Sequence, residues 1–325
     1  MRLHEKLMRR QSFAQYSWFV LFFNLLVIIW GAFVRASNSG DGCGDHWPLC
    51  GKHLIPSIQH IATLIEFLHR ISTGVATAFL IIMIIWAFLA FPPKHPARLG
   101  ASLAFLFTFL EAALGAVLVL FNLVDKNTSV ARVIAMSAHQ GNTLLLLASL
   151  ALTARWGGSD LFVRYEDRMK LGKRLLIALT ATMALAITGA ITALADTLYP
   201  ASSLSSALHQ DFSSTAPYLI HLRAFHPPVA VAVMLLVIFT ATSVIRERPS
   251  PDTIRLARGV IILFLIELTA GVINLLLLAP IWMQGVHLFI ADILWVNLVL
   301  LSASALTAQY IPQFIRKEEY APAIR

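Results

Sequence analysis

Long apolar runs recur along the whole chain and constrain its fold more than any other feature. Eight runs are as long as the roughly 20 residues that an α-helix needs to cross a bilayer. They lie near residues 16–36, 61–91, 100–124, 133–154, 175–197, 217–245, 257–280 and 284–310. Only 13% of the 325 residues are charged, against roughly 25% in a soluble domain. The sequence therefore predicts an all-α polytopic membrane protein with eight transmembrane helices, and a soluble helical core is the weaker alternative.

The basic side chains indicate how these helices are oriented. With eight helices, both termini and the connections after the second, fourth and sixth helices lie on one side. That side carries 19 of the 25 Lys and Arg residues, and the other side carries 6. Because basic residues concentrate on the cytoplasmic side, we expect a multi-pass protein of the bacterial inner (plasma) membrane with both termini in the cytoplasm. The net charge of +8 then reflects topology, so membrane lipid and not nucleic acid is the expected partner. The first run is too long for a signal-peptide core and lacks a following small-residue cleavage site, so we expect it to be retained.

Features of the first half recur in the second half in the same order. The matches lie at offsets of 148 to 158 residues and pair Gly31 with Gly189, His69 with His226, Glu111 with Glu267, and His139 with His287. The sequence therefore predicts two pseudo-repeated four-helix bundles, related by an axis along the membrane normal. We place them at 1–155 and 175–325, joined by a cytoplasmic linker of mixed charge at 156–174.

Both cysteines of the chain, Cys43 and Cys50, lie in the loop after the first apolar run. The topology assigns this loop to the oxidising periplasm, where disulfides persist. Neighbouring glycines and Pro48 allow the chain to turn tightly enough for the sulfurs to meet. A disulfide is the preferred interpretation, while two free thiols or a transient redox pair remain open. Zinc is disfavoured, because His46 and His53 do not complete a known zinc spacing.

Four of the 11 histidines lie inside apolar runs. They are His69, His139, His226 and His287, each roughly five to nine residues, or about 7–13 Å, from the outer end of its helix. A lone histidine there often only bonds a neighbouring helix, but two pairs at matched depth suit the axial positions of two haem irons. A dinuclear copper or iron site would need further carboxylates or thiolates beside each pair. We therefore expect one bis-histidine haem site in each half.

The surroundings of the histidines differ between the halves. Glu66 and Arg70 flank His69, whereas Arg223 and Pro227 hold the matching positions around His226. Ionisable groups inside a membrane are costly and usually functional. A carboxylate beside a haem accepts protons or stabilises a developing cation. We therefore expect a reactive haem in the first half and a structural or electron-transferring haem in the second.

Several motifs together suggest a family. They are Gly31-Ala32-Phe33-Val34-Arg35, the loop with Cys43 and Trp47-Pro48-Leu49-Cys50-Gly51, Glu66-Phe67-Leu68-His69-Arg70, Arg223-Ala224-Phe225-His226-Pro227, and the stretch from Gly271 through Asn274, Pro280 and His287 to Trp295. Over nearly its whole length the chain resembles the haem A synthase family, an oxidoreductase family that converts haem O to haem A for cytochrome oxidase. The resemblance also includes the eight-helix plan in two halves.

The resemblance implies a role for each group. His226 and His287 would bind a haem b cofactor, and His69 and His139 would bind the substrate, haem O. Glu66 would take part in oxidising the C8 methyl group to hydroxymethyl and then formyl, and Cys43 and Cys50 would form a disulfide. A haem O synthase and cytochrome oxidase assembly would be the partners. The chain departs from the family at Glu111 and Glu267, where glutamine is expected; a protonated glutamate that packs like glutamine and a proton path are the two interpretations.

Three arginines near the outer ends, Arg35, Arg70 and Arg223, are candidates to contact haem propionates or to support the site. For Arg35 and Arg223, an interfacial anchor is the alternative. Two rival functions remain, a dihaem b-type electron-transfer protein linked to quinol and a haem transporter; Glu66 argues against the first. The sequence leaves open the electron acceptor, the source of the formyl oxygen and whether the protein forms a homo-oligomer.

Overall fold

The structure, a computed structural model, describes residues 2–51, 55–56, 60–158, 164–165 and 169–308. Helices dominate this part of the chain: α1 (Arg2–Ala36), α2 (Ile61–Ala90), α3 (Pro96–Leu120), α4 (Val130–Gly157), α5 (Met169–Leu198), α6 (Leu204–Phe212), α7 (Tyr218–Glu247), α8 (Pro251–Leu276) and α9 (Ile281–Leu306). Two short strands, β1 (Arg164–Tyr165) and β2 (Thr307–Ala308), pair antiparallel. The prediction of an all-α fold is confirmed.

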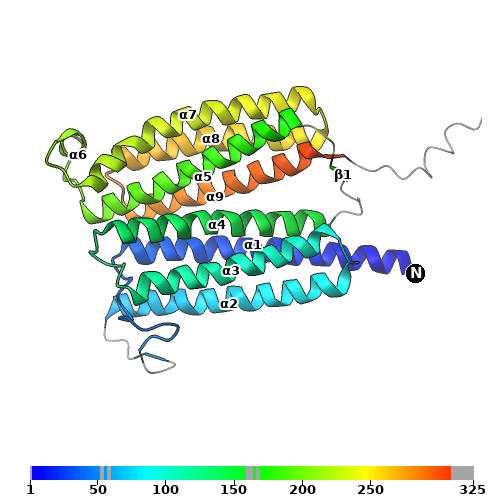
Figure 1. Ribbon diagram of the computed structural model, residues 1–325, viewed down its shortest axis with the longest axis horizontal. Coiled ribbons are helices and arrows are strands. Elements are labelled where there is room, and N and C mark those ends of the chain that lie inside the picture. The colour runs from blue at the N-terminus through cyan, green and yellow to red at the C-terminus, as the bar shows by residue number, and fades with distance from the viewer. Residues whose placement is uncertain (1, 52–54, 57–59, 159–163, 166–168, 309–325) are drawn as a thin grey trace, which may run out of the picture.

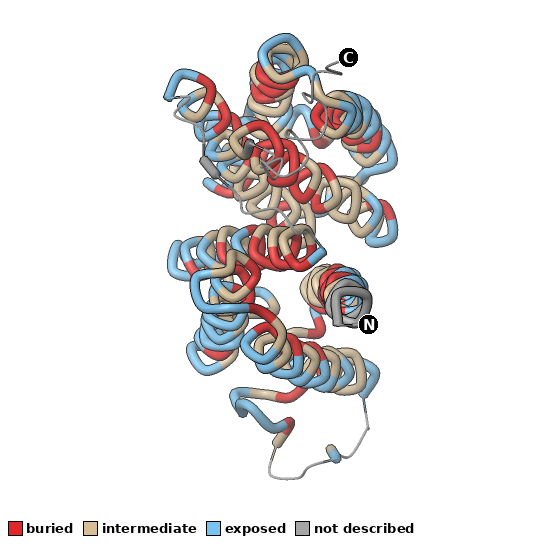
Figure 2. The backbone as a smooth tube through the Cα atoms, turned by 90° about the vertical axis from the view of Figure 1, so that its right-hand side faces the viewer, coloured by how far each residue is buried: buried red, intermediate tan, exposed pale blue. Residues whose placement is uncertain are grey.

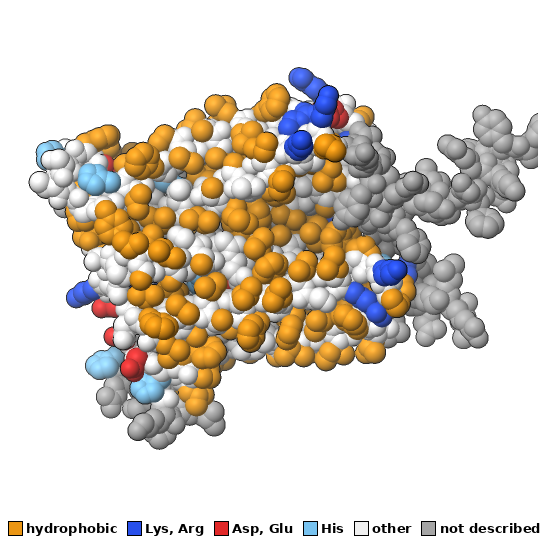
Figure 3. Space-filling model, in the orientation of Figure 1, with side chains coloured by type: hydrophobic (Ala, Val, Ile, Leu, Met, Phe, Trp, Pro, Cys, Tyr) orange, Lys and Arg blue, Asp and Glu red, His pale blue; other side chains and the backbone are white. Residues whose placement is uncertain are grey.

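All the described helices except α6 are long and apolar enough to cross a membrane. Their spans agree with the eight predicted runs to within a few residues, so the protein is a multi-pass membrane protein. Figure 3 shows apolar side chains covering the middle of the visible face and basic side chains gathered towards the end where the N-terminus lies. This distribution is typical of a membrane helix bundle, whose lipid-facing surface is apolar and whose ends are polar.

The long helices form two groups of four that lie side by side (Figure 1). One group consists of α1, α2, α3 and α4, and the other of α5, α7, α8 and α9. Helix α4 packs against α5 and α9, so it joins the groups. The short helix α6 and the loop between α1 and α2 lie at the same end of the molecule (Figure 1), which we call the loop end; the opposite end is the N-terminal end.

Buried residues lie in both groups (Figure 2), and the apolar ones among them form the core. The main cluster lies towards the N-terminal end and contains Phe13, Leu80, Leu150, Leu171 and Leu298 among its largest fully buried members. A smaller cluster of Leu194, Ala195 and Leu219 lies at the loop end. The helices are therefore packed tightly away from the loop end, which leaves the loop end for polar groups.

Candidate functional site

The four intramembrane histidines all lie towards the loop end, on the second or third turn of helices that begin there. His69 lies on α2 and His139 on α4, and their rings are close enough to interact electrostatically. His226 on α7 and His287 on α9 form the equivalent pair in the second group. The structure therefore brings together one histidine pair inside each four-helix group.

Three of these imidazole rings lie against a glycine of a neighbouring helix. A Cβ atom on Gly31 would lie 3.0 Å from Cε1 of His69, and one on Gly189 would lie 3.1 Å from Cε1 of His226. The same atom on Gly271 would lie 3.2 Å from Cε1 of His287. Glycine is needed here because a side chain would push the ring out of place.

Two carboxylates that the sequence singled out contact histidines. Oε1 of Glu111 lies 3.3 Å from Nδ1 of His139, and Oε1 of Glu267 lies 3.0 Å from Nδ1 of His287. In neither case does the ring N–H align well enough to complete a hydrogen bond. Both contacts nevertheless place an acceptor beside Nδ1 and leave Nε2 as the atom that can bind a metal. Whether these glutamates pack or conduct protons remains a prediction.

Glu111 is fixed by its own hydrogen bonds. Its Oε2 accepts a bond from Nδ2 of Asn142 at 2.5 Å, and its Oε1 accepts one from the hydroxyl of Thr143. Asn142 and Thr143 follow His139 by three and four residues on α4, so all three lie on one helix face. The sequence analysis missed both residues, although this spacing was a signal for them.

Among the four histidines, only His226 makes a hydrogen bond at Nδ1 to a described residue. Oγ1 of Thr188 lies 2.9 Å from its Nδ1. Thr188 directly precedes Gly189 on α5, and the sequence analysis did not select it. In contrast, Nδ1 of His69 is buried and has no hydrogen-bond partner among the described residues.

Glu66 is held between the loop and Arg70. Only 3% of its surface is exposed. Its Oε2 accepts a hydrogen bond of 2.8 Å from the backbone N–H of Cys43, and its Oε1 accepts bonds from Nε and Nη2 of Arg70 at 3.1 and 2.5 Å. Three donors on one carboxylate fix its position.

Arg70 and a disulfide shape the loop over this half. Cys43 and Cys50 are bonded to each other, with their Cα atoms 4.7 Å apart, so the preferred interpretation of the cysteines is confirmed. Nη1 of Arg70 donates to the carbonyl oxygens of His46 at 2.6 Å and Leu49 at 2.8 Å. The loop is therefore attached to the helix turn that carries Glu66 and His69.

The donor set of each histidine pair suits a haem more than a bare metal ion. Among the described residues, no group of three or more His, Cys, Asp or Glu could hold such an ion. A haem iron needs only two protein ligands, because the porphyrin supplies the other four nitrogens. The two imidazoles of each pair meet that need, and in His139, His226 and His287 the contact at Nδ1 leaves Nε2 free.

Comparison with known families agrees with this plan. A family model described as cytochrome oxidase assembly protein (COX15-CtaA) matches residues 14–299, which include all four intramembrane histidines and Glu66. The chain belongs to the cytochrome oxidase assembly protein family. The resemblance noted from the motifs is thereby confirmed at the level of the family.

Individual relatives share different lengths of the chain. A Thermus thermophilus protein named protoheme IX farnesyltransferase is 44% identical over 293 residues, which are 90% of this chain and 48% of that protein. Proteins named heme A synthase from Exiguobacterium sibiricum and Halalkalibacterium halodurans are 34% and 37% identical over 137 and 127 residues. These segments are 42% and 39% of this chain and 43% and 42% of the relatives. The chain thus spans about half the length of the relatives that it matches.

In this family member, Arg223 is bound by two carboxylates. It is only 8% exposed. Its Nη1 lies 3.0 Å from Oδ1 of Asp196, and its Nη2 lies 2.6 Å from Oδ1 of Asp211 on α6. Neither aspartate was predicted from the sequence: Asp211 lies on α6, which was not predicted, and Asp196 lies near the end of α5. Arg223 therefore ties α6 to the helix turn that carries His226.

Arg35 links the two helix groups. Its Nη1 donates to the carbonyl oxygen of Ala193 at 2.7 Å and to Oγ1 of Thr197 at 2.8 Å, both on α5. Its Nη2 donates to Oε1 of Gln284 on α9 at 2.9 Å. All three arginines that we expected near propionates thus donate to protein oxygens, and contact with a propionate remains a prediction.

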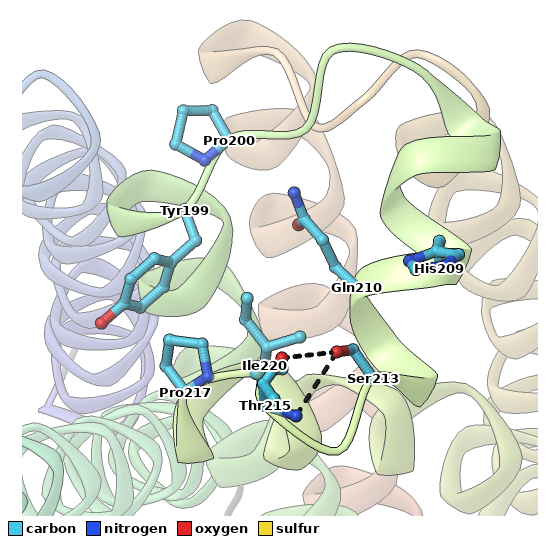
Figure 4. A pocket seen from close by; sticks show the side chains of 9 residues that line it. Tyr199, Pro200, His209, Gln210, Ser213, Thr215, Pro217 and Ile220 are labelled. Atoms are coloured by element: carbon cyan, nitrogen blue, oxygen red, sulfur yellow. Dashed lines mark hydrogen bonds between the residues drawn. The ribbon is translucent and has the colours of Figure 1, made fainter.

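A shallow pocket of about 410 Å³ lies at the loop end of the second group. Figure 4 shows it between the end of α5, marked by Tyr199, and α6, which carries His209 and Gln210. Ser213 and Thr215 on its floor bond to each other at 3.0 Å. None of the residues that we predicted for the site lines this pocket.

Proposed function

We propose that the protein is a haem A synthase that oxidises the C8 methyl group of haem O to a formyl group. The family membership and the relatives named heme A synthase support this proposal. The observation that carries it is the asymmetry between the histidine pairs: a buried carboxylate, Glu66, lies one helical turn from His69. The equivalent position beside His226 holds Arg223, which cannot accept a proton.

We assign the second pair to a haem b cofactor and the first pair to the substrate. His226 and His287 each have an acceptor beside Nδ1, and such contacts strengthen a histidine as a metal ligand. A permanently bound cofactor needs that strength. His69 and His139 lie in the half that carries Glu66, where a substrate would be oxidised.

Glu66 accepts protons released from the methyl group in this proposal. Its position is fixed by Arg70 and by the N–H of Cys43, and the carboxylate is the base that receives a proton. A haem iron, when bound, supplies the centre that accepts electrons. The disulfide loop covers Glu66 and would limit the access of water to the site.

The setting of the protein follows from the same proposal. We place it in the bacterial inner membrane with both termini in the cytoplasm, which the basic N-terminal end supports (Figure 3). Its expected partners are a haem O synthase, which supplies the substrate, and the assembly of cytochrome oxidase, which uses the product. The Thermus relative named for farnesyl transfer to haem supports the link to the first partner.

Pigment analysis tests the function directly. The protein should be produced in cells that also make haem O, and the extracted haems separated by chromatography. We expect haem A from the wild type, haem b but no haem A from His69→Ala or His139→Ala, and loss of stable haem b from His226→Ala or His287→Ala. Two haems without haem A in the wild type would favour the dihaem electron-transfer alternative. A folded wild-type protein without any haem would exclude both functions.

Farnesyl transfer is the second candidate, because the farnesyltransferase relative covers 90% of this chain. The same extraction separates the two reactions. If cells lacking a haem O synthase produce haem O when this protein is present, the chain transfers the farnesyl group. If they contain only haem b, and haem A appears once haem O is supplied, the oxidation is supported.

A further inference from the structure

The four histidines differ in what lies beside Nδ1. A carboxylate oxygen lies 3.3 Å from that atom in His139 and 3.0 Å in His287, and a hydroxyl oxygen lies 2.9 Å from it in His226. Nδ1 of His69 is also buried, and among the described residues it has neither a hydrogen-bond partner nor a carboxylate beside it. We call a ring anchored when an oxygen lies beside its Nδ1, through a hydrogen bond at His226 and through a carboxylate contact at His139 and His287. Both rings of the second pair are then anchored, whereas in the first pair only His139 is.

The hydroxyl of Thr188 has a defined role towards His226. A threonine hydroxyl carries one proton, and Oγ1 of Thr188 donates it to the carbonyl oxygen of Leu185 at 2.7 Å. The contact with His226 must therefore run the other way, from Nδ1–H to Oγ1. This fixes the tautomer of His226 with its lone pair on Nε2, the form that binds a metal.

The matching residue in the first group cannot do this. Trp30 precedes Gly31 as Thr188 precedes Gly189. An indole is a hydrogen-bond donor only, and Nε1 of Trp30 already donates to the carbonyl oxygen of Ile65 at 3.1 Å. Gly31 still positions the His69 ring by close contact, but within the described part of the chain no hydrogen bond at Nδ1 fixes its tautomer.

We propose that His69 is the exchangeable ligand of the substrate site, and that this one unanchored imidazole is what lets the porphyrin enter and leave. The inference rests on the proposed function, since an exchangeable ligand is useful where a substrate is bound and a product released. The second pair, anchored at both rings, holds its group permanently. His139 keeps the first site specific for the porphyrin while His69 comes off and returns.

The rate at which His69 leaves its iron can be estimated from the effect of hydrogen-bonded partners on metal-binding histidines. Loss of the hydrogen-bonded partner of a metal-binding histidine typically lowers metal affinity by about 10- to 100-fold. A histidine without a partner should therefore leave its iron about 10 to 100 times more often than an anchored one. Carbon monoxide reports this directly, because it binds a reduced bis-histidine haem only when one histidine has left.

The first experiment adds an acceptor next to His69. Protein with both sites filled is reduced with dithionite and mixed with carbon monoxide, and the absorbance change is followed. In the wild type, we expect binding at one haem only. Trp30→Thr, which copies the hydroxyl of Thr188, should slow this binding by about 10- to 100-fold. Trp30→Val is the control, because valine has the shape of threonine but no hydroxyl. It should bind carbon monoxide at the wild-type rate or faster.

The second experiment removes the anchor from His226. Thr188→Val keeps the shape of the side chain but loses the acceptor, so the second haem should now bind carbon monoxide and pass to apomyoglobin about 10 to 100 times faster. Thr188→Ser keeps the hydroxyl and should behave as the wild type. These two variants test whether an acceptor beside Nδ1 keeps a histidine on its iron, even if the Trp30 variants do not fold.

Two results would overturn the inference. One is that the wild type binds carbon monoxide equally at both haems or at neither; the other is that the Val and Ser variants at Thr188 behave alike. The haem A content of the same membranes is measured as well, so that the role of His69 and the proposed function are tested separately. If haem A is formed while either result is obtained, the proposed function stands and the role of His69 falls. If haem A is not formed, the proposed function falls.

Discussion

At the scale of single residues, Glu66 occupies the position where the two groups differ most. The residue three positions before the histidine is Glu66 in one group and Arg223 in the other. Both are buried and both are bound by groups of opposite charge, Arg70 in the first case and Asp196 with Asp211 in the second. The residue at this position therefore supports local structure in both groups. Only in the first group is it a base, Glu66.

Glu66→Gln separates these two roles. Glutamine keeps the size of the side chain and one acceptor for Arg70, but it has no basic carboxylate. We expect the variant to fold, to keep haem b at His226 and His287, and to accumulate haem O or its hydroxylated form. General-base catalysis typically contributes about 100- to 10,000-fold, so the yield of haem A should fall by at least about 100-fold. Chromatography of extracted haems measures this, with haem b as reference.

Glu247→Gln is the matched control for that change. Glu247 lies at the N-terminal end, where it pairs with Arg174 at 2.6 Å on the surface. Its replacement should leave the haem composition as in the wild type. Wild-type levels of haem A from Glu66→Gln would remove Glu66 from the chemistry and leave it as a support for the loop.

Single-residue reasoning from sequence succeeds where a residue is rare in its setting. Histidines and glutamates stand out in a membrane helix because they are costly there. Thr188 does not stand out, because α5 also carries Thr180, Thr182, Thr192 and Thr197, whose hydroxyls bond to the backbone of their own helix. Only the position of His226 across the helix interface distinguishes Thr188 from them.

At the scale of elements, each group has a covering segment at the loop end that is tied to the turn before its first histidine. In the first group the segment is the disulfide loop, attached through Glu66 and Arg70. In the second group it is α6, attached through Arg223 and Asp211. The attachments use different chemistry, and each ties a polar segment to the helix turn next to a histidine.

Opening the disulfide should affect the first group alone. A disulfide between residues 7 apart restrains the unfolded chain by only about 2–3 kcal/mol in the loop-entropy model. The bonds from Arg70 also remain. We therefore expect Cys43→Ser to fold and to keep its haem b, but to lose most of its haem A yield as the cover over Glu66 loosens. Spectra and haem extraction measure both quantities, and a parallel loss of haem b and haem A would contradict this expectation.

The inner turn before α3 should make stability depend on pH. Nδ1 of His95 accepts a hydrogen bond from the N–H of Ala97 at 3.2 Å. Burial, followed by the nearby charges of Arg10 and Arg98, lowers the pKa of His95 below its ordinary value. The unfolded chain then binds more protons than the folded one. The contribution of neutral His95 is therefore complete above the unfolded pKa of about 6.5 and is lost as the pH falls below it.

A variant tests this dependence. His95→Asn keeps a side-chain acceptor at the helix start but does not titrate. Between pH values of about 7.5 and 5.5, on either side of the unfolded pKa, the midpoint of thermal unfolding should fall less in the variant than in the wild type. Equal pH dependence of the two proteins would show that His95 does not contribute.

The predicted helix bounds differ from the structure at both ends. The predicted ends at 124, 280 and 310 lie four residues beyond the ends of α3, α8 and α9, and the predicted starts are late where polar residues begin a helix. Ser129 and Ser250 precede α4 and α8, and their hydroxyls accept hydrogen bonds from the backbone of the first turn. A hydropathy pattern begins later, at the first apolar stretch, and so misses these turns. It also missed α6, because nine residues with two serines, a histidine and an aspartate carry no apolar run.

At the scale of the whole molecule, side-chain contacts join the two groups of helices in addition to the covalent connection between α4 and α5. Arg35 on α1 bonds to α5 and α9. Nε1 of Trp295 on α9 donates to the carbonyl oxygen of Leu144 on α4 at 2.7 Å, in a fully buried position. These contacts come from residues far apart in sequence, so the sequence predicted two groups but not how they meet.

The two groups should therefore assemble without a covalent connection. Residues 1–158 and 159–325, expressed as two chains in one cell, should copurify and bind haem b, because α4, α5, α9 and Arg35 provide the interface. Arg35→Leu in the first chain should reduce copurification several-fold, since it leaves the oxygens of Thr197 and Gln284 without their donor.

Arg98→Leu is the control for the split protein. Arg98 bonds to the carbonyl oxygen of Phe88 within the first group and should not affect copurification. Failure of the unmodified chains to copurify would show that the connection at 156–174 is needed to bring the groups together.

The position of the main apolar cluster has a consequence for the direction of charge movement. Leucine, alanine and phenylalanine side chains close the N-terminal end of both groups, while every histidine of the two pairs lies towards the loop end. Protons taken from a substrate at His69 would meet a packed apolar barrier in one direction and the polar loop in the other. The proposed oxidation would thus be vectorial: it would acidify the compartment facing the disulfide loop and make the yield of product sensitive to the proton gradient across the membrane.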